Sequence, residues 1–129
     1  MLRGLLLSSA LALVALPALA RDNYALLIGA SQYPSLDEKY WLKGPANDVR
    51  LVKTYLTTSA PVPFDPVNIA VLADGVEGSA PPTLTAIRAA FADLAGKVRP
   101  GDFVYLHFSG HGTQAPAANP ETELDGLDE

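Results

Sequence analysis

Apolar residues along the chain gather in three short continuous runs, and two segments with helical periodicity separate these runs. The runs cover residues 23–30, 68–72 and 103–108, and their length and branched or aromatic composition are typical of buried strands. In segments 46–56 and 84–98, apolar residues recur at intervals of three and four, as on one face of an amphipathic helix. This alternation predicts an α/β fold whose parallel strands are joined by right-handed helical crossovers.

Residues at the ends of these segments support the predicted boundaries. Pro45 suits the first turn of the first helix, and Thr83 offers a side-chain cap to the second. Asp74 with Gly75 marks a turn after the second run, and Pro100 ends the second helix before the third run begins. Three strands with two helices leave open sheet edges and bare faces, so we expect an incomplete fold.

Residues 1–20 have the pattern of a secretory signal peptide. Arg3 precedes a long apolar run, which ends in the small-residue motif Ala-Leu-Ala. The length of the run would nearly allow an uncleaved membrane anchor instead. Pro17 and the alanine-rich ending favour cleavage after Ala20, which predicts an exported, periplasmic or extracellular protein without a stable membrane anchor.

Charge and composition narrow the function classes. The chain of 129 residues contains 9 basic and 14 acidic residues, for a formal net charge of −5. An acidic chain without a basic patch is poorly suited to nucleic acid, so we expect no nucleic-acid partner. The sequence contains no cysteine, which excludes a disulfide framework and a thiol nucleophile within these residues. Residues 21–114 have the length of one small domain.

The C-terminal segment, residues 115–129, differs in composition from the rest of the chain. Five of its last nine residues are acidic, and it has almost no large apolar side chains. Composition favours a solvated, flexible tail or a loop cut short. A hard-cation site is the alternative, because Asp125, Asp128 and Glu129 offer oxygen ligands around Gly126. The segment lacks the alternating ligands and closing glutamate of an EF-hand loop.

One histidine stands where open α/β sheets place their sites. The third apolar run delivers Ser109, Gly110 and His111 to the carboxyl end of a predicted strand. His107 and His111 cannot share a metal, because a strand separates them by about 13 Å at about 3.3 Å per residue. Ser109 does not fit a nucleophile elbow, which needs glycine where the chain has His107. These residues alone leave His111 open as a catalytic base or as a structural turn residue.

Four segments carry recognisable motifs: YALLIGASQY at 24–33, LKGPANDV at 42–49, HFSGHGTQ at 107–114 and DGLDE at 125–129. In this order, and with this alternation of elements between them, they resemble the caspase-like peptidases of family C14, particularly the metacaspases. The resemblance implies a three-layer caspase-like α/β fold with a mostly parallel sheet, of which this chain is the N-terminal part. It also implies a cysteine endopeptidase that acts on peptide or protein substrates.

The resemblance assigns roles to four residues. His111 corresponds to the dyad histidine, and Gly112 to the glycine whose backbone N–H stabilises the oxyanion. Asp48 matches the acidic residue that gives metacaspases their preference for Arg or Lys before the cleaved bond, and Ser109 matches its neighbour in the pocket. Helix capping is the alternative role for Asp48.

Two further acidic residues match a cation site of some relatives. Asp125 and Asp128 fall where some metacaspases recruit calcium. The resemblance requires no cofactor, and calcium is the candidate ion.

The chain departs from the family at the nucleophile. In the family the cysteine lies on a later strand, typically in an Asp-x-Cys-x-Gly context, and this chain has no cysteine. We therefore expect the chain alone to be inactive, with the cysteine supplied by a C-terminal portion or a second chain. The alternatives are a non-catalytic caspase-like module that binds a partner chain and an unrelated doubly wound α/β domain with a loop histidine.

Overall fold

The computed structural model describes residues 21–118, 121 and 127–128. The predicted signal peptide, residues 1–20, lies outside the described residues. Within the described part of the chain, no helix is both long enough and apolar enough to cross a membrane.

Three parallel strands form the main sheet in the order β2-β1-β3. β1 spans Asn23–Gly29, β2 spans Ile69–Ala73 and β3 spans Phe103–Ser109. β1 lies in the middle and pairs with both neighbours, in parallel on each side. The three predicted strands and their parallel order are confirmed.

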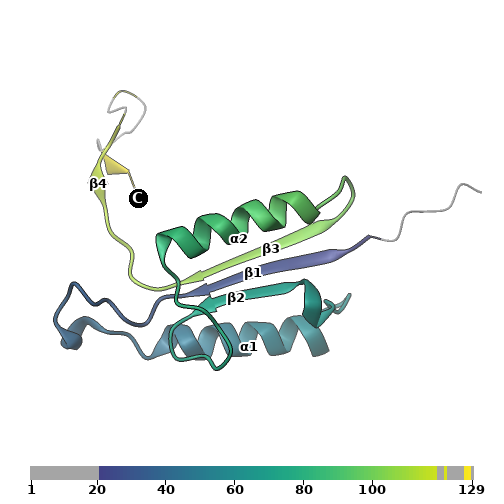
Figure 1. Ribbon diagram of the computed structural model, residues 1–129, viewed down its shortest axis with the longest axis horizontal. Coiled ribbons are helices and arrows are strands. Elements are labelled where there is room, and N and C mark those ends of the chain that lie inside the picture. The colour runs from purple at the N-terminus through teal and green to yellow at the C-terminus, as the bar shows by residue number, and fades with distance from the viewer. Residues whose placement is uncertain (1–20, 119–120, 122–126, 129) are drawn as a thin grey trace, which may run out of the picture.

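Two helices cover opposite faces of this sheet and give the fold three layers (Figure 1). α1 spans Gly44–Thr58 and connects β1 to β2, whereas α2 spans Leu84–Lys97 and connects β2 to β3. Pro45 lies in the first turn of α1, as predicted. The Thr83 hydroxyl caps α2 by accepting a hydrogen bond from the Ala86 N–H at 3.2 Å.

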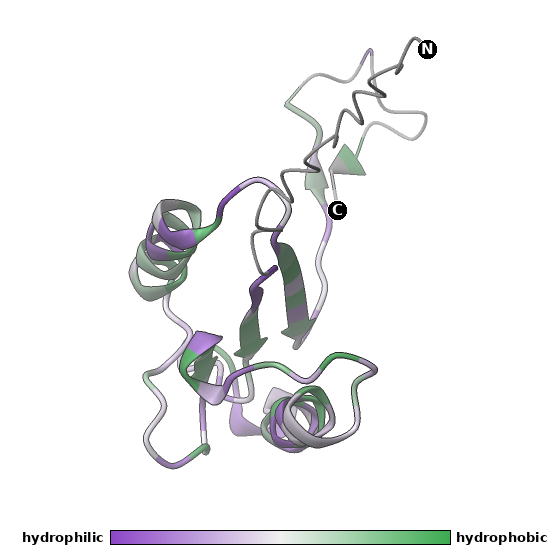
Figure 2. Ribbon diagram, turned by 90° about the vertical axis from the view of Figure 1, so that its right-hand side faces the viewer, coloured by the Kyte–Doolittle hydropathy of each residue, from purple (hydrophilic) through white to green (hydrophobic). Residues whose placement is uncertain are grey.

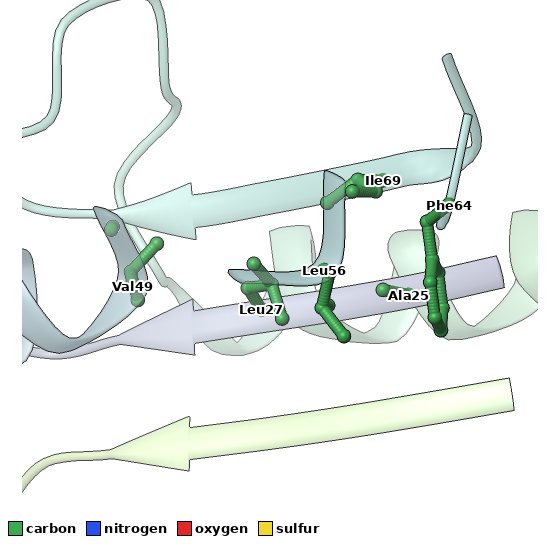
Figure 3. Close-up of a cluster of buried hydrophobic side chains, with 7 residues drawn as sticks. Ala25, Leu27, Val49, Leu56, Phe64 and Ile69 are labelled. Carbon is green, nitrogen blue, oxygen red and sulfur yellow. The ribbon is translucent and has the colours of Figure 1, made fainter. Parts of the chain in front are cut away.

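The face of the sheet that α1 covers holds the main hydrophobic core. Leu27 of β1 is fully buried, and Val49 and Leu56 of α1 pack against the same face (Figure 3). The strands of the central layer are mostly hydrophobic, whereas the two outer helices carry both hydrophobic and hydrophilic residues (Figure 2). The buried members of the cluster are Ala25, Leu27, Val49, Leu56, Phe64, Ile69 and Ala73.

β3 forms where predicted, but it is not the buried strand that its apolar composition indicated. It lies at the edge of the sheet, and Phe103, Leu106 and Phe108 are 40%, 45% and 60% exposed. Within the described residues only β1 pairs with it, and Phe91 of α2 covers part of Phe108 with the ring centroids 6.3 Å apart. A continuous apolar run is typical of a strand flanked on both sides, so β3 has the composition of a central strand in an edge position.

The remaining elements are short. η1 (Glu38–Tyr40) and η2 (Pro66–Asn68) are single 3₁₀ turns in the connections before and after α1. In the acidic C-terminal segment, β4 (Ala115–Pro116) pairs antiparallel with β5 (Leu127–Asp128). Composition gave no indication of this strand pair.

α1 and β1 approach each other closely at Gly29, the last residue of β1. A Cβ atom added there would lie 2.8 Å from Cγ2 of Val49 and 2.9 Å from the carbonyl oxygen of Pro45. Neither group can move aside easily, because Val49 is buried in the core and the Pro45 oxygen belongs to the helix backbone. Glycine therefore allows the first turns of α1 to lie directly against the end of β1.

We predict that Gly29→Ala destabilises the chain by about 1–3 kcal/mol, the usual cost of overpacking a filled core. Gly96→Ala in α2 is the matched control, because nothing lies within 4 Å of a Cβ added there. That change should be neutral or stabilise by up to about 1 kcal/mol, since alanine favours helix over glycine. Urea denaturation followed by circular dichroism measures both. Equal stability of the two variants would contradict the close approach.

The Asp102 carboxylate fastens the residue before β1 to the turn before β3. One oxygen accepts the Asp22 N–H at 3.0 Å, and the other accepts the Arg99 N–H at 2.8 Å. These backbone hydrogen bonds, that of Arg99 first and that of Asp22 second, hold the pKa of Asp102 below its usual value. Folding therefore favours the ionised carboxylate.

Because folding lowers its pKa, the Asp102 carboxylate stabilises the fold above the ordinary aspartate pKa of about 3.9 and loses this effect as the pH falls through the lowered pKa. We predict that Asp102→Asn is less stable than the wild type near neutral pH and that the gap shrinks below about pH 4. Urea denaturation of both proteins across this range measures the gap. A gap of constant size at every pH would show that ionisation of Asp102 contributes nothing.

Candidate active site

The three strands of the main sheet end at one edge, and four of the predicted site residues, Asp48, Ser109, His111 and Gly112, lie there. β1 ends at Gly29, β2 at Ala73 and β3 at Ser109. The Ala30 N–H donates to the Ser109 carbonyl at 2.9 Å, which continues the pairing of β1 and β3 just past the end of β1. His111 follows within two residues of the end of β3, so it projects from the carboxyl edge of a parallel sheet.

Asp48 and Ser109 are joined directly, although they are distant in sequence. The Ser109 hydroxyl donates a hydrogen bond to Oδ2 of Asp48 at 2.5 Å. Asp48 does not cap its helix, because α1 has Lys43 as its N-cap residue and Asp48 lies in the second turn. Its exposed carboxylate stands at the carboxyl edge beside the end of β3, where it can accept hydrogen bonds from a cationic group.

His111 is held at two points by the loop that follows β1. Its backbone N–H donates to the phenol oxygen of Tyr33 at 2.7 Å, and its Nε2 lies 2.7 Å from the carbonyl oxygen of Tyr40. A carbonyl only accepts hydrogen bonds, so the second contact requires a proton on Nε2. The Tyr33 and His111 rings also lie together, with centroids 4.8 Å apart. This arrangement leaves Nδ1 as the nitrogen that can accept a proton.

The loop that holds His111 is itself fastened to the sheet. Oδ2 of Asp74, directly after β2, accepts the N–H groups of Ser31 and Gln32, each at 3.1 Å. Further along, Nε1 of Trp41 donates to the Tyr33 carbonyl at 3.1 Å. The start of the loop is therefore fixed relative to the end of β2, and its far end is fastened back to Tyr33.

Tyr33, Tyr40 and Asp74 are absent from the set of site residues predicted from the sequence. Two signals point to them. An aspartate that directly follows an apolar strand lies at the carboxyl edge of the sheet, and three aromatic residues stand in one polar loop after β1. Which groups they contact depends on the tertiary fold, because Tyr33 and Tyr40 bind a histidine more than seventy positions away.

The other predicted site residues are placed only in part. Gly112 follows His111 and is exposed, with nothing within 4 Å of an added Cβ. Asp125 lies outside the described residues, and Asp128 is described only as backbone in β5. No group of three or more His, Cys, Asp or Glu side chains that could hold a metal occurs among the described residues.

The architecture and the site define a class of protein. An all-parallel sheet between two helices, with a carboxylate and an imidazole at its carboxyl edge, is consistent with part of a caspase-like α/β fold. Residues 23–129 match the family profile described as the metacaspase, peptidase C14 domain. The chain therefore belongs to the metacaspase family, as the sequence motifs predicted, and the alternative of an unrelated doubly wound domain is wrong.

Several metacaspases are similar to this chain. Metacaspase-4 of Arabidopsis thaliana is 42% identical over 105 residues, which cover 81% of this chain and 24% of that protein. Metacaspase-6 of the same plant is 38% identical over 105 residues, covering 81% of this chain and 27% of that protein. Metacaspase-1A of Aspergillus oryzae is 35% identical over 106 residues, covering 81% and 24%. The chain spans about a quarter of the length of these relatives.

Proposed function

We propose that this chain carries the general base and the specificity pocket of a metacaspase-type cysteine endopeptidase that cleaves after Arg or Lys. The observation that supports this most directly is the placement of His111. Its Nε2 is engaged by the Tyr40 carbonyl, while the ring stands exposed at the carboxyl edge of the sheet. The Asp48–Ser109 pair lies at the same edge.

In the proposed reaction, His111 activates a cysteine thiol that these 129 residues do not contain. Nδ1 takes the thiol proton, and the thiolate attacks the carbonyl carbon of the scissile peptide bond. The backbone N–H of Gly112 donates to the oxyanion of the tetrahedral intermediate. The imidazolium then gives its proton to the leaving amine, and water hydrolyses the acyl-enzyme to release the second product and regenerate the thiol.

Asp48 supplies the preference for a basic residue. Its carboxylate is exposed and negatively charged, and a guanidinium or ammonium group can pair with it through charge-assisted hydrogen bonds. Ser109 donates to one oxygen of this carboxylate and thereby fixes its orientation. An acidic side chain in the same position would meet like charge, which disfavours cleavage after Asp or Glu.

In this proposal, the strand that carries the cysteine pairs with the free edge of β3. β3 has a partner on one side only within the described sheet, and its composition suits a strand with two neighbours. A strand that carries the cysteine adds along this edge, either from a C-terminal portion of the same protein or from a second chain. A non-catalytic module needs no oriented imidazole at the carboxyl edge, so the site favours the peptidase.

Two predictions from the sequence accompany this proposal. Export directed by residues 1–20 places the peptidase outside the cytoplasm. Calcium at Asp125 and Asp128 accompanies activity without being required for the chemistry of the dyad.

We predict that the chain alone hydrolyses no Arg- or Lys-terminated fluorogenic peptide, with or without calcium. The imidazole has no thiol to activate, and a base without its nucleophile gives little of the covalent mechanism. Release of the fluorophore should equal that in buffer. Clear turnover that His111→Ala abolishes would contradict the requirement for an external cysteine.

We predict that the chain binds acetyl-arginine methylamide at the Asp48–Ser109 pair. In a titration followed by nuclear magnetic resonance (NMR), the amide signals of Asp48 and Ser109 should move, and the acetyl-glutamate analogue should leave them unchanged. Asp48→Asn removes the charge and should weaken binding about ten-fold or more, the usual worth of a hydrogen bond to a charged group.

Asp93→Asn is the matched control for this titration. Asp93 lies on the exposed face of α2 and pairs with Lys97 at 2.6 Å, away from the carboxyl edge residues of the site. It should leave the affinity for acetyl-arginine methylamide unchanged. Equal affinity of the Asp48→Asn variant and the wild type would remove Asp48 from the specificity pocket.

A further inference from the structure

The hydrogen-bond ladder between β1 and β3 has a regular pattern up to its last rung. The Asp22 carbonyl accepts the Phe103 N–H at 2.9 Å, and the Ala30 N–H donates to the Ser109 carbonyl at 2.9 Å. In a parallel ladder, every second residue of one strand makes two hydrogen bonds. Its N–H and its carbonyl bond to the residues just before and just after its partner on the other strand. The next rung would therefore join the His111 N–H directly to the Ala30 carbonyl.

The phenol oxygen of Tyr33 occupies that rung. It donates to the Ala30 carbonyl at 3.1 Å and accepts the His111 N–H at 2.7 Å, so both backbone groups bind the phenol instead of each other. We infer that Tyr33 is a positioning residue, which ends the β1–β3 ladder and sets where His111 leaves the sheet. The inference rests on the proposed function only in calling His111 the base.

Gly110 supports this inference by an independent observation. A Cβ added at Gly110 would lie 2.9 Å from the Tyr33 phenol oxygen and 3.3 Å from Cβ of Ala30. The phenol thus fills the space between the diverging chains, and the residue before His111 has room only for glycine. The requirement for glycine here comes from close approach and not from backbone angles, since Gly110 is not among the described glycines with positive φ.

Tyr33 also positions the imidazole. Its ring lies against the His111 ring with centroids 4.8 Å apart, and the Tyr33 carbonyl is fixed by Nε1 of Trp41 at 3.1 Å. The next aromatic residue of this loop after Tyr33 is Tyr40, and its carbonyl accepts a hydrogen bond from Nε2 of His111. One loop therefore controls both the backbone and the side chain of His111.

Tyr33→Phe tests the inference in the full chain, because it removes the phenol oxygen and keeps the ring. We expect about ten-fold faster amide hydrogen exchange at His111, the loss of one typical hydrogen bond. We also expect loss of the nuclear Overhauser contacts between the ring of residue 33 and the His111 imidazole. If the ladder closes onto the Ala30 carbonyl instead, the amide stays slow but the ring contacts are lost, which supports the inference equally.

Tyr55→Phe is the control, since this tyrosine is 52% exposed on α1 and lies far along the sheet from the carboxyl edge. It should change neither signal at His111. If Tyr33→Phe leaves both the exchange rate and the ring contacts at His111 unchanged, the inference is overturned.

If Tyr33→Phe does not fold, Gly110→Ala tests the same inference. The added methyl group displaces the phenol oxygen of Tyr33, which lies 2.9 Å from the position of the new Cβ. Unchanged ring contacts in that variant would likewise overturn the inference. These signals need no catalysis, so they separate an error about Tyr33 from an error about the peptidase, which the acetyl-arginine titration tests.

Discussion

β1 is the one strand of the described main sheet with a neighbour on both sides, and the site depends on that pairing. Its register places Gly29 opposite Ala73 on β2 and opposite Ser109 on β3. Three chain segments that are far apart in sequence therefore end side by side. Parallel pairing makes this unavoidable, since each helical crossover returns the chain to the same starting edge and every strand finishes at the opposite one. The carboxyl edge then collects whatever residues follow the strands.

Close packing at the end of β1 determines where Asp48 lies relative to this shared edge. The first turns of α1 lie against Gly29, and Val49 locks the helix into the core beneath it. Asp48 is the residue before Val49, so burial of one side chain determines where the other emerges. It emerges beside Ser109, within hydrogen-bonding distance. The polar pair is thus positioned by hydrophobic packing, with its own hydrogen bond adding only orientation.

The sequence predicts the elements well and the contacts of the loops poorly, for a physical reason. Apolar runs and helical spacing report burial of each segment, which is a local property, and all three main strands and both helices form where those patterns indicate. The motifs also single out Asp48 and Ser109, which the structure joins, and His111, which follows the end of the same strand. The partners of His111 escape prediction, because a tyrosine in a polar loop has no pattern that reveals which distant group it binds. The exposure of β3 was not predicted for a different reason. Its apolar composition is typical of a strand with two neighbours, but composition does not show how many neighbours the strand has in this structure.

The surroundings of His111 bear on whether it is a base or only a structural residue. A structural histidine in a turn usually has its polar atoms satisfied by the fold. Here Nε2 of the exposed ring donates to the Tyr40 carbonyl, and that bond assigns the proton to Nε2 and leaves Nδ1 to accept another. The groups that impose this geometry, Tyr33 and Tyr40, belong to a loop that Asp74 ties to β2. The orientation of the imidazole therefore follows from contacts within this part of the fold. If the proposed function holds, a segment that supplies the cysteine has only to bring its sulfur to a nitrogen already in place, which is the preorganisation that proton transfer requires.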